Sequence, residues 1–297
     1  MKYRPKHIVE YILLRGMLGA VNALSLRAAL MLGWLVGVFF FYVLHFRTKK
    51  AVNRLEEVFG DRFLPRERRR IAWLSFRNIC FNAVEAARFH KLTPEKMRRM
   101  PIFAAIDQVH RANKENGALI IATAHMGNWD LAGVASKLSD IPIFSIARRQ
   151  KNPLTDELLN KMRNATGMEV ILNDSRVLQN VVRKLKSGGV LAILPDVRSQ
   201  TEALSIDFLG DKANLGAGTA LFAQMADCPV YPVVITRRGW TQHDAKVFAP
   251  VYPDKTIDRN EDRRRIMQTV VSHFNDEIFA HPEQYFWFNK RWVLDPV

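Results

Sequence analysis

The hydrophobic pattern of the chain changes twice and divides it into three regions. The residues from Ala28 to Phe46 include no Asp, Glu, Lys or Arg. Nineteen helical residues at about 1.5 Å each would span roughly 28 Å, close to the hydrocarbon thickness of a bilayer. Residues 48–116 follow a helical pattern, clearest over 66–91, where Pro65 stands near the start. Beyond residue 117, short apolar runs alternate with helical patterns.

This alternation predicts the fold of the larger part of the chain. We expect strands at 118–124, 141–147, 168–171, 190–194, 230–235 and 245–248. We expect helices at 129–138, 153–165, 176–186, 216–226 and 258–280. Strands that alternate with helices are typical of an α/β fold with a mixed, largely parallel sheet flanked by helices. The domain boundary falls near residue 47, with an apolar helical segment at 1–47 and a single domain at 48–297.

The apolar segment at the N-terminus allows more than one arrangement. A cleaved signal peptide is disfavoured, because the apolar run comes late and no small-residue cleavage site follows it. The sequence leaves open a membrane-spanning helix, a helical hairpin lying in the membrane face, and a hairpin buried against the domain. Arg15 and Arg27, together with Gly33 and Gly37, weaken a clean span. Basic residues flank both ends, so the orientation is also undecided.

Charge and cysteine content narrow the class of protein. The 297 residues carry 44 Lys and Arg against 29 Asp and Glu, a formal net charge of +15. A chain this basic is suited to anionic partners such as a membrane surface, nucleic acid or an acidic protein. Its two cysteines, Cys80 and Cys228, exclude a disulfide framework and a Cys-rich zinc site. No metal-binding or nucleotide-binding motif is present, so we expect no metal and no cofactor.

The strongest candidate for a catalytic site is the segment that follows the expected strand at 118–124. His125 ends this strand, a Gly-Asn turn follows, and a helix begins near Trp129. Asn128 suits the N-cap, and Asp130 falls in the first helical turn, where its side chain can reach back to the imidazole. A histidine held by a carboxylate is a general-base device. We therefore predict His125 and Asp130 as catalytic residues.

Spacing alone is a weak signal for this pair. The pattern His-x4-Asp/Glu also occurs at His110/Glu115 and His90/Glu95, in polar or proline-broken segments. Only His125 follows an expected strand and precedes a helix, and a histidine merely packed at a strand end is the alternative. No G-x-S-x-G nucleophile motif exists, so the base would activate a hydroxyl that arrives on the substrate.

Several blocks of sequence, in the same order, resemble the bacterial lipid A biosynthesis (lauroyl/myristoyl) acyltransferases of the lysophospholipid acyltransferase superfamily. They are NRLEEVFGD, ERRRIAWLSFRNICFNAVEAARF, HMGNWD, ARRQKNPLTDELLNKMRNATG, ILPDVRS, DFLGDKANLGAGTALFAQMADCPVYPV and HPEQYFWFNKRW. The resemblance extends over nearly the whole chain. It implies a glycerol-3-phosphate acyltransferase-like fold and transfer of an acyl group from a thioester to a lipid hydroxyl.

Further site residues follow from position and from this resemblance. Arg148 matches an arginine of the family and would contact an oxyanion or a phosphate, although a surface pair with Asp156 is the alternative. Asn152 opens the helix at 153–165 and also suits a helix cap. Asp196 follows the strand at 190–194 and would hold an arginine or assist His125. The remaining substrate-binding candidates are Gly210, which would shape the pocket, and Trp287 and Arg291, which suit a lipid headgroup.

The resemblance also implies partners and a location. An acyl carrier protein or acyl-coenzyme A would donate the acyl group, a lipid A precursor would accept it, and the enzyme would work on the anionic, cytoplasmic face of the bacterial inner membrane. We expect no nucleic-acid partner. The chain departs from the family pattern at Asn289, Asn214 and Val197. These departures leave the His125–Asp130 pair intact, but they weaken what the resemblance implies about the acceptor and the acyl chain. The alternatives are an acyltransferase for a lysophospholipid or another glycolipid and, more remotely, a non-catalytic membrane-tethered binder of anionic ligands.

Overall fold

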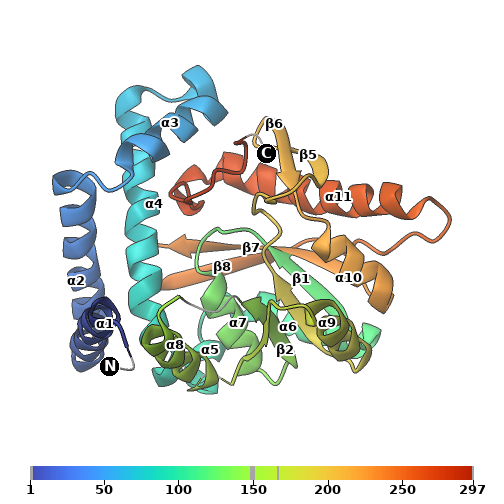
Figure 1. Cartoon of the computed structure of the whole chain (residues 1–297), viewed down its shortest axis with the longest axis horizontal. Helices are drawn as coiled ribbons and strands as arrows, with labels where there is room; N and C mark the ends of the chain where they lie inside the picture. The colour runs from blue at the N-terminus through green and yellow to red at the C-terminus, as the bar shows by residue number, and fades with distance from the viewer. Residues whose placement is uncertain (1–2, 148–150, 166, 296–297) are drawn as a thin grey trace.

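The computed structural model describes residues 3–147, 151–165 and 167–295. A six-stranded sheet in the order β3-β2-β4-β1-β7-β8 forms its centre, and only the β7–β8 pairing is antiparallel within it (Figure 1). The strands in this spatial order are β3 (Glu169–Leu172), β2 (Ile143–Ala147), β4 (Val190–Ile193), β1 (Leu119–Thr123), β7 (Val230–Arg238) and β8 (Gln242–Val247). The predicted mixed, largely parallel sheet is confirmed.

Helices cover both faces of this sheet. Alternate side chains of β1 explain why: Ile120 and Ala122 face one hydrophobic cluster, whereas Leu119 and Ile121 face another. The second cluster includes residues of α5 (Pro94–Arg98), α6 (Phe103–Asn116) and α7 (Trp129–Lys137). The first includes residues of α3 (Thr48–Phe59), α4 (Pro65–Ala86), α9 (Val177–Lys186), α10 (Gly218–Ala226) and α11 (Arg259–Ala280).

One strand pair was not predicted from the sequence. β5 (Leu204–Phe208) and β6 (Asp211–Leu215) form a separate antiparallel hairpin that lies over α11 (Figure 1). Asn275 of α11 accepts a hydrogen bond from the Leu209 backbone N–H at 2.8 Å, and Gln268 accepts one from Asp207 at 2.9 Å. The hairpin is therefore attached to the helix by side-chain amides that meet its backbone.

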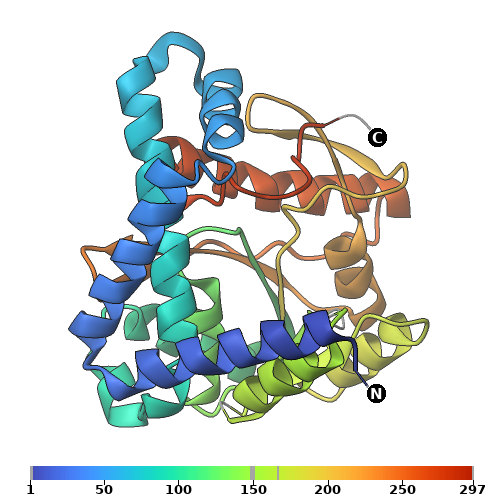
Figure 2. The same cartoon turned by 60° about the vertical axis from the view of Figure 1, so that its left-hand side comes forward.

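The N-terminal segment forms a helical hairpin of α1 (Pro5–Ala23) and α2 (Leu26–Val38), and α2 continues into a π-helical turn, Phe39–Val43. α2 runs along α4, and α1 crosses α8 (Pro153–Ala165), as Figure 2 shows. Glycines allow the close approach of α2: a Cβ on Gly33 would lie 2.9 Å from Val84, and one on Gly37 would lie 3.3 Å from Cys80. Residues Leu26–Val43 are long and apolar enough to cross a membrane, although 28% of this stretch is buried in the protein.

Candidate functional site

The site lies at the carboxyl ends of the two central strands. Strands β1 and β4 are parallel neighbours, and their register pairs Ala122 with Ile193. Three residues further along each strand come His125 and Asp196. Adjacent parallel strands therefore carry these two side chains to the same edge of the sheet, where α/β proteins place their ligand sites.

His125 and Asp196 form a closely held pair. The Asp196 Oδ1 atom lies 2.8 Å from His125 Nδ1, and Oδ2 accepts a hydrogen bond from the His125 backbone N–H at 2.7 Å. Asp196 is fully buried, whereas one fifth of the His125 side chain is exposed. Because a carboxylate only accepts hydrogen bonds, Nδ1 is the donor, and the lone pair of the imidazole is on Nε2.

Two carboxylates act on the pKa of His125. Burial alone would lower this pKa, but the charge of Asp196, its hydrogen bond and the charge of Asp130 together raise it above the ordinary histidine value. Asp130 lies in the first turn of α7, as predicted. Asn128 caps that helix, also as predicted, by accepting a hydrogen bond from the Leu131 N–H at 3.0 Å.

An open cleft of about 560 Å³ lies over this edge of the sheet. His125, Asp130 and Trp129 line it beside residues from the ends of β2 and β4, the start of α9 and the C-terminal Arg291. The Trp129 and His125 ring centroids are 5.1 Å apart, and Phe286 lies 6.4 Å from His125 on the C-terminal segment. The cleft is wide enough for a substrate group beside the imidazole.

A smaller apolar cavity lies beyond the cleft. It has a volume of about 40 Å³ and is enclosed by the central strands together with α6 and α7. Four residues line both spaces: Thr123, Trp129, Gly133 and Ala192. Gly133 stands where the two meet, and a Cβ on it would lie 2.9 Å from the Met168 sulfur. The apolar cavity therefore adjoins the cleft, and Met168 packs against Gly133 where the two meet.

The structure brings together part of the predicted set. His125, Asp130, Asp196 and Arg291 lie at the cleft or in contact with a residue that lines it. Arg148 falls outside the described residues, so its role stays a prediction. Sequence reasoning placed Asp196 at the site but expected Asp130 to be the carboxylate that orients His125. The signal in the sequence was that His125 and Asp196 each come one or two residues after the end of a predicted strand.

Asn152 holds the N-terminal helix. Its side-chain amide donates to the His7 carbonyl at 3.1 Å and to Glu10 Oε2 at 2.9 Å, and its Oδ1 accepts from the Leu154 N–H at 3.1 Å. The residue is buried. It thus caps α8, which was one of the two expectations from the sequence, and it ties this helix to α1.

Gly210 and Trp287 differ from their expected positions. Gly210 lies in the tight turn of the β5–β6 hairpin with φ +85°, and it is not among the residues that line the cleft. The Trp287 side chain is fully buried, and its Nε1 donates to the Pro282 carbonyl at 2.7 Å. A tryptophan in this position packs the core and is not open to a lipid headgroup.

A profile of the bacterial lipid A biosynthesis acyltransferase family matches residues 2–293. The chain belongs to this family. Family membership thus agrees with the resemblance of the sequence blocks, and acyl transfer is the reaction class that the family name describes.

Individual relatives are distant. The phosphatidylinositol mannoside acyltransferase of Mycolicibacterium smegmatis is 22% identical over 64% of the chain, and this region spans 62% of that protein. The lipid A biosynthesis palmitoleoyltransferase of Escherichia coli K12 is 21% identical over 78% of the chain and 74% of its own length. The solved structure of the 1-acyl-sn-glycerophosphate acyltransferase PlsC from Thermotoga maritima is 18% identical, covers 86% of this chain and 98% of its own, and has a TM-score of 0.39.

Proposed function

We propose that the protein is a membrane-associated acyltransferase that moves a fatty acyl group from an acyl thioester to a hydroxyl of a lipid A precursor. The observation that carries this proposal is the His125–Asp196 pair at the cleft edge of a chain that belongs to the lipid A acyltransferase family. His125 is the general base in this proposal.

The hydrogen bonds of His125 support that role. With Nδ1 donating to Asp196, Nε2 accepts the proton of the lipid hydroxyl while the oxygen attacks the thioester carbonyl. The C–S bond then breaks, the acyl ester forms, and the proton passes from the imidazolium to the departing thiolate. Asp196 stabilises the imidazolium between these two steps. Asp130 adds a second negative charge to the same cleft.

We assign the acyl chain to the apolar cavity beside Gly133. Its lining includes Ile106, Val109 and Ile121, and it shares a wall with the cleft next to the base. At about 40 Å³ the cavity has room for only a few water-sized groups, so a chain enters only when side chains such as Met168 move. A chain that enters here would leave its thioester carbonyl near His125.

The acceptor has a second candidate. The M. smegmatis relative is named as a phosphatidylinositol mannoside acyltransferase, whose name describes a glycolipid acceptor without lipid A. A glycolipid or lysophospholipid hydroxyl would use the same base and the same thioester chemistry. The donor is an acyl carrier protein in our proposal, because the net charge of +15 favours an acidic carrier.

Membrane association is supported by the surface of the N-terminal hairpin. Most large hydrophobic side chains that are exposed among the described residues lie within 8–46, including Val9, Leu13 and Val43. Single exposed apolar residues are ordinary, but a continuous set on adjacent helices marks an interaction surface. We place this surface on the cytoplasmic face of the inner membrane.

A thioester-release assay tests the function. Purified protein in detergent receives acyl carrier protein and coenzyme A donors of several chain lengths, with a bacterial lipid extract as acceptor, and mass spectrometry identifies the product. We expect acyl addition by the wild type and its loss in His125→Ala. Turnover by His125→Ala at the wild-type rate would refute His125 as the base, and products formed only on lipids other than lipid A precursors would favour the second acceptor.

A further inference from the structure

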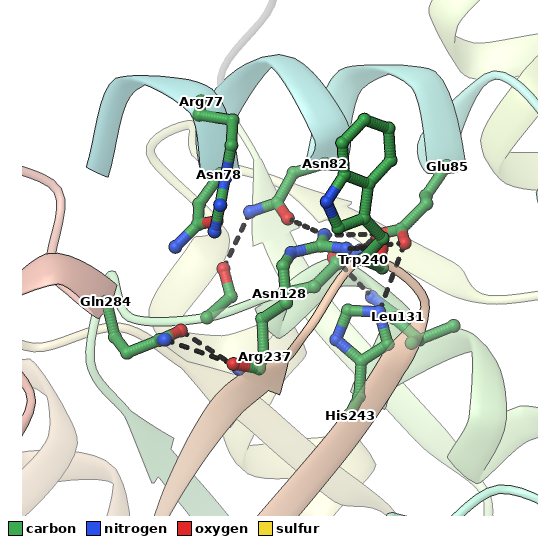
Figure 3. Close-up of polar contacts among 11 residues, drawn as sticks. Arg77, Asn78, Asn82, Glu85, Asn128, Leu131, Arg237, Trp240, His243 and Gln284 are labelled. Atoms are coloured by element: carbon green, nitrogen blue, oxygen red, sulfur yellow. Dashed lines mark hydrogen bonds and ion pairs between the residues drawn. The ribbon is translucent and has the colours of Figure 1, made fainter. Parts of the chain in front are cut away.

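A buried ion cluster lies behind the turn that carries His125. It consists of Glu85 from α4, Arg237 from β7 and His243 from β8, each with less than a tenth of its surface exposed. We call it the Glu85 cluster (Figure 3). Arg237 donates from Nη1 to Oε1 at 2.8 Å and from Nη2 to Oε2 at 2.5 Å, and His243 Nε2 lies 3.1 Å from Oε1.

The Glu85 carboxylate carries its charge throughout the physiological range. Burial alone would raise its pKa, but the hydrogen bonds from His243 and Arg237 and the charge of Arg237 lower it to about 2. The ionised carboxylate therefore only accepts hydrogen bonds, and it can accept further ones from neighbouring side chains.

Two asparagines connect this cluster to the catalytic turn. Asn128 donates from Nδ2 to Glu85 Oε2 at 2.6 Å, and Asn82 donates from Nδ2 to the Gly127 carbonyl at 2.6 Å. Asn82 is held in turn, because its Oδ1 accepts from Arg237 Nη2 at 2.6 Å. Figure 3 shows Asn82 and Glu85 reaching from α4 toward the turn and the two strands below it.

The other backbone groups of the turn are also engaged. The Gly127 N–H donates to the Gln284 carbonyl at 3.0 Å, and the His125 carbonyl accepts from the Phe286 N–H at 2.9 Å. Gly127 has φ +60°, and a Cβ there would lie 2.2 Å from the Ile235 carbonyl oxygen. The turn therefore packs closely against β7 on one side and is hydrogen-bonded to the Glu85 cluster through Asn82 and Asn128 on the other.

The Glu85 cluster is not explained by stability alone. The cost of removing buried charges from water offsets most of their attraction, and apolar side chains of the same volume often stabilise a fold equally well. Paired charges do, however, hold the groups around them in one defined geometry. We propose that the Glu85 cluster is a positioning device for the catalytic turn, which through Asn128 and Asn82 sets the place of His125 against Asp196. This inference rests on the proposed role of His125 as base.

Two variants separate positioning from folding. Asn128→Ser keeps a side chain that caps α7, but the shorter group does not reach Glu85. Asn82→Ala removes the donor to the Gly127 carbonyl and leaves the Arg237–Glu85 pair in place. Asn113→Ala is the matched control, because Asn113 is buried and donates to a glycine carbonyl, Gly117, at 2.7 Å, away from the cleft.

The steady-state constants give the first measurement. We expect kcat to fall about 10- to 100-fold in Asn128→Ser and Asn82→Ala, with little change in KM, because a small displacement of the base affects the chemical step. The same substitutions in a His125→Ala background should cause no further loss, since they act through His125. Asn113→Ala should keep the wild-type kcat even where its melting temperature falls.

The second measurement follows the imidazole itself. Long-range ¹H–¹⁵N correlation spectra of histidine-labelled protein report the tautomer and the pKa of His125, whose facing charged groups are Asp196, Asp130, Arg198 and Arg291. We expect both variants to lower this pKa, because the contact with Asp196 loosens. Wild-type kcat and wild-type His125 resonances in both variants would overturn the positioning role. A fully active His125→Ala would instead refute the proposed function on which it rests.

Discussion

At the scale of single residues, His125 is surrounded by two carboxylates that differ in burial and contact. Asp196 is fully buried and meets both Nδ1 and the backbone N–H of His125, whereas Asp130 is exposed, lines the cleft and raises the pKa of His125 through its charge. The Asp196 carboxylate fixes the tautomer of the His125 imidazole, and the Asp130 carboxylate adds a negative charge that favours the protonated imidazole. These two contributions can be tested separately.

Asp196→Asn removes the fixed tautomer. The two N–H groups of His125 meet different oxygens of Asp196, and the substitution turns one of these oxygens into an NH2 group, which is a donor and faces a donor. We expect kcat to fall about 10²- to 10⁴-fold, with a smaller effect on KM, in the thioester-release assay. Asp130→Asn is the comparison, and a larger loss in that variant would assign the orienting role to Asp130.

With His125 as the proposed base, its raised pKa predicts a particular pH dependence of catalysis. A base works unprotonated, so a pKa above the ordinary histidine value moves the rising limb of kcat/KM to higher pH. We expect this limb above about pH 6.5 in the wild type and at lower pH in Asp196→Asn, where the charge that raises the pKa is gone. Initial rates between about pH 5 and 9 measure it, and an unchanged limb would show that another group titrates.

At the scale of elements, most of the sheet could be predicted because its strands are short apolar runs separated by helical patterns. The β5–β6 hairpin was missed because charged residues such as Asp207, Asp211 and Lys212 interrupt the apolar pattern. Similarly, local spacing points from His125 to Asp130, whereas Asp196 comes 71 residues later and meets His125 only because β1 and β4 are neighbours. Strand order is set by long-range packing that a local pattern does not carry.

The cleft and the apolar cavity share part of their walls, and Gly133 of α7 lines both. Gly133→Val places a branched side chain against Met168 and narrows the space between cleft and cavity, at a cost of about 1 to 3 kcal/mol in stability from overpacking. We expect the variant to prefer shorter acyl donors than the wild type. Competition between donors of several chain lengths, read by mass spectrometry, measures this preference. A lower rate with the same chain-length preference would contradict an acyl chain in this cavity.

At the scale of the whole molecule, the exposed apolar residues gather on the N-terminal hairpin, on the side away from α10 (Figure 1). Leu13→Glu and Val43→Glu should weaken binding to anionic vesicles about tenfold or more each, because burying one such side chain contributes about 1.5 to 3 kcal/mol. Met225→Glu on α10 is the control, since Met225 is equally a large exposed hydrophobic residue. Co-sedimentation measures binding, and an equal loss in all three variants would refute a specific docking surface.

The packing of this hairpin favours a position along one leaflet of the membrane over a helix that crosses the bilayer. A helix that crosses the bilayer is surrounded by lipid or by other membrane-spanning helices. Gly33 and Gly37 instead bring α2 against α4, a helix that packs on the sheet, and Phe41 belongs to the main core. We therefore expect the hairpin to lie along one leaflet, with the α1–α2 turn and the start of α3 on the same side of the membrane. In cells, Ser25→Cys and Lys49→Cys should react with an impermeant maleimide only after the inner membrane is opened. Labelling of one position alone in intact spheroplasts would instead demonstrate a crossing between them.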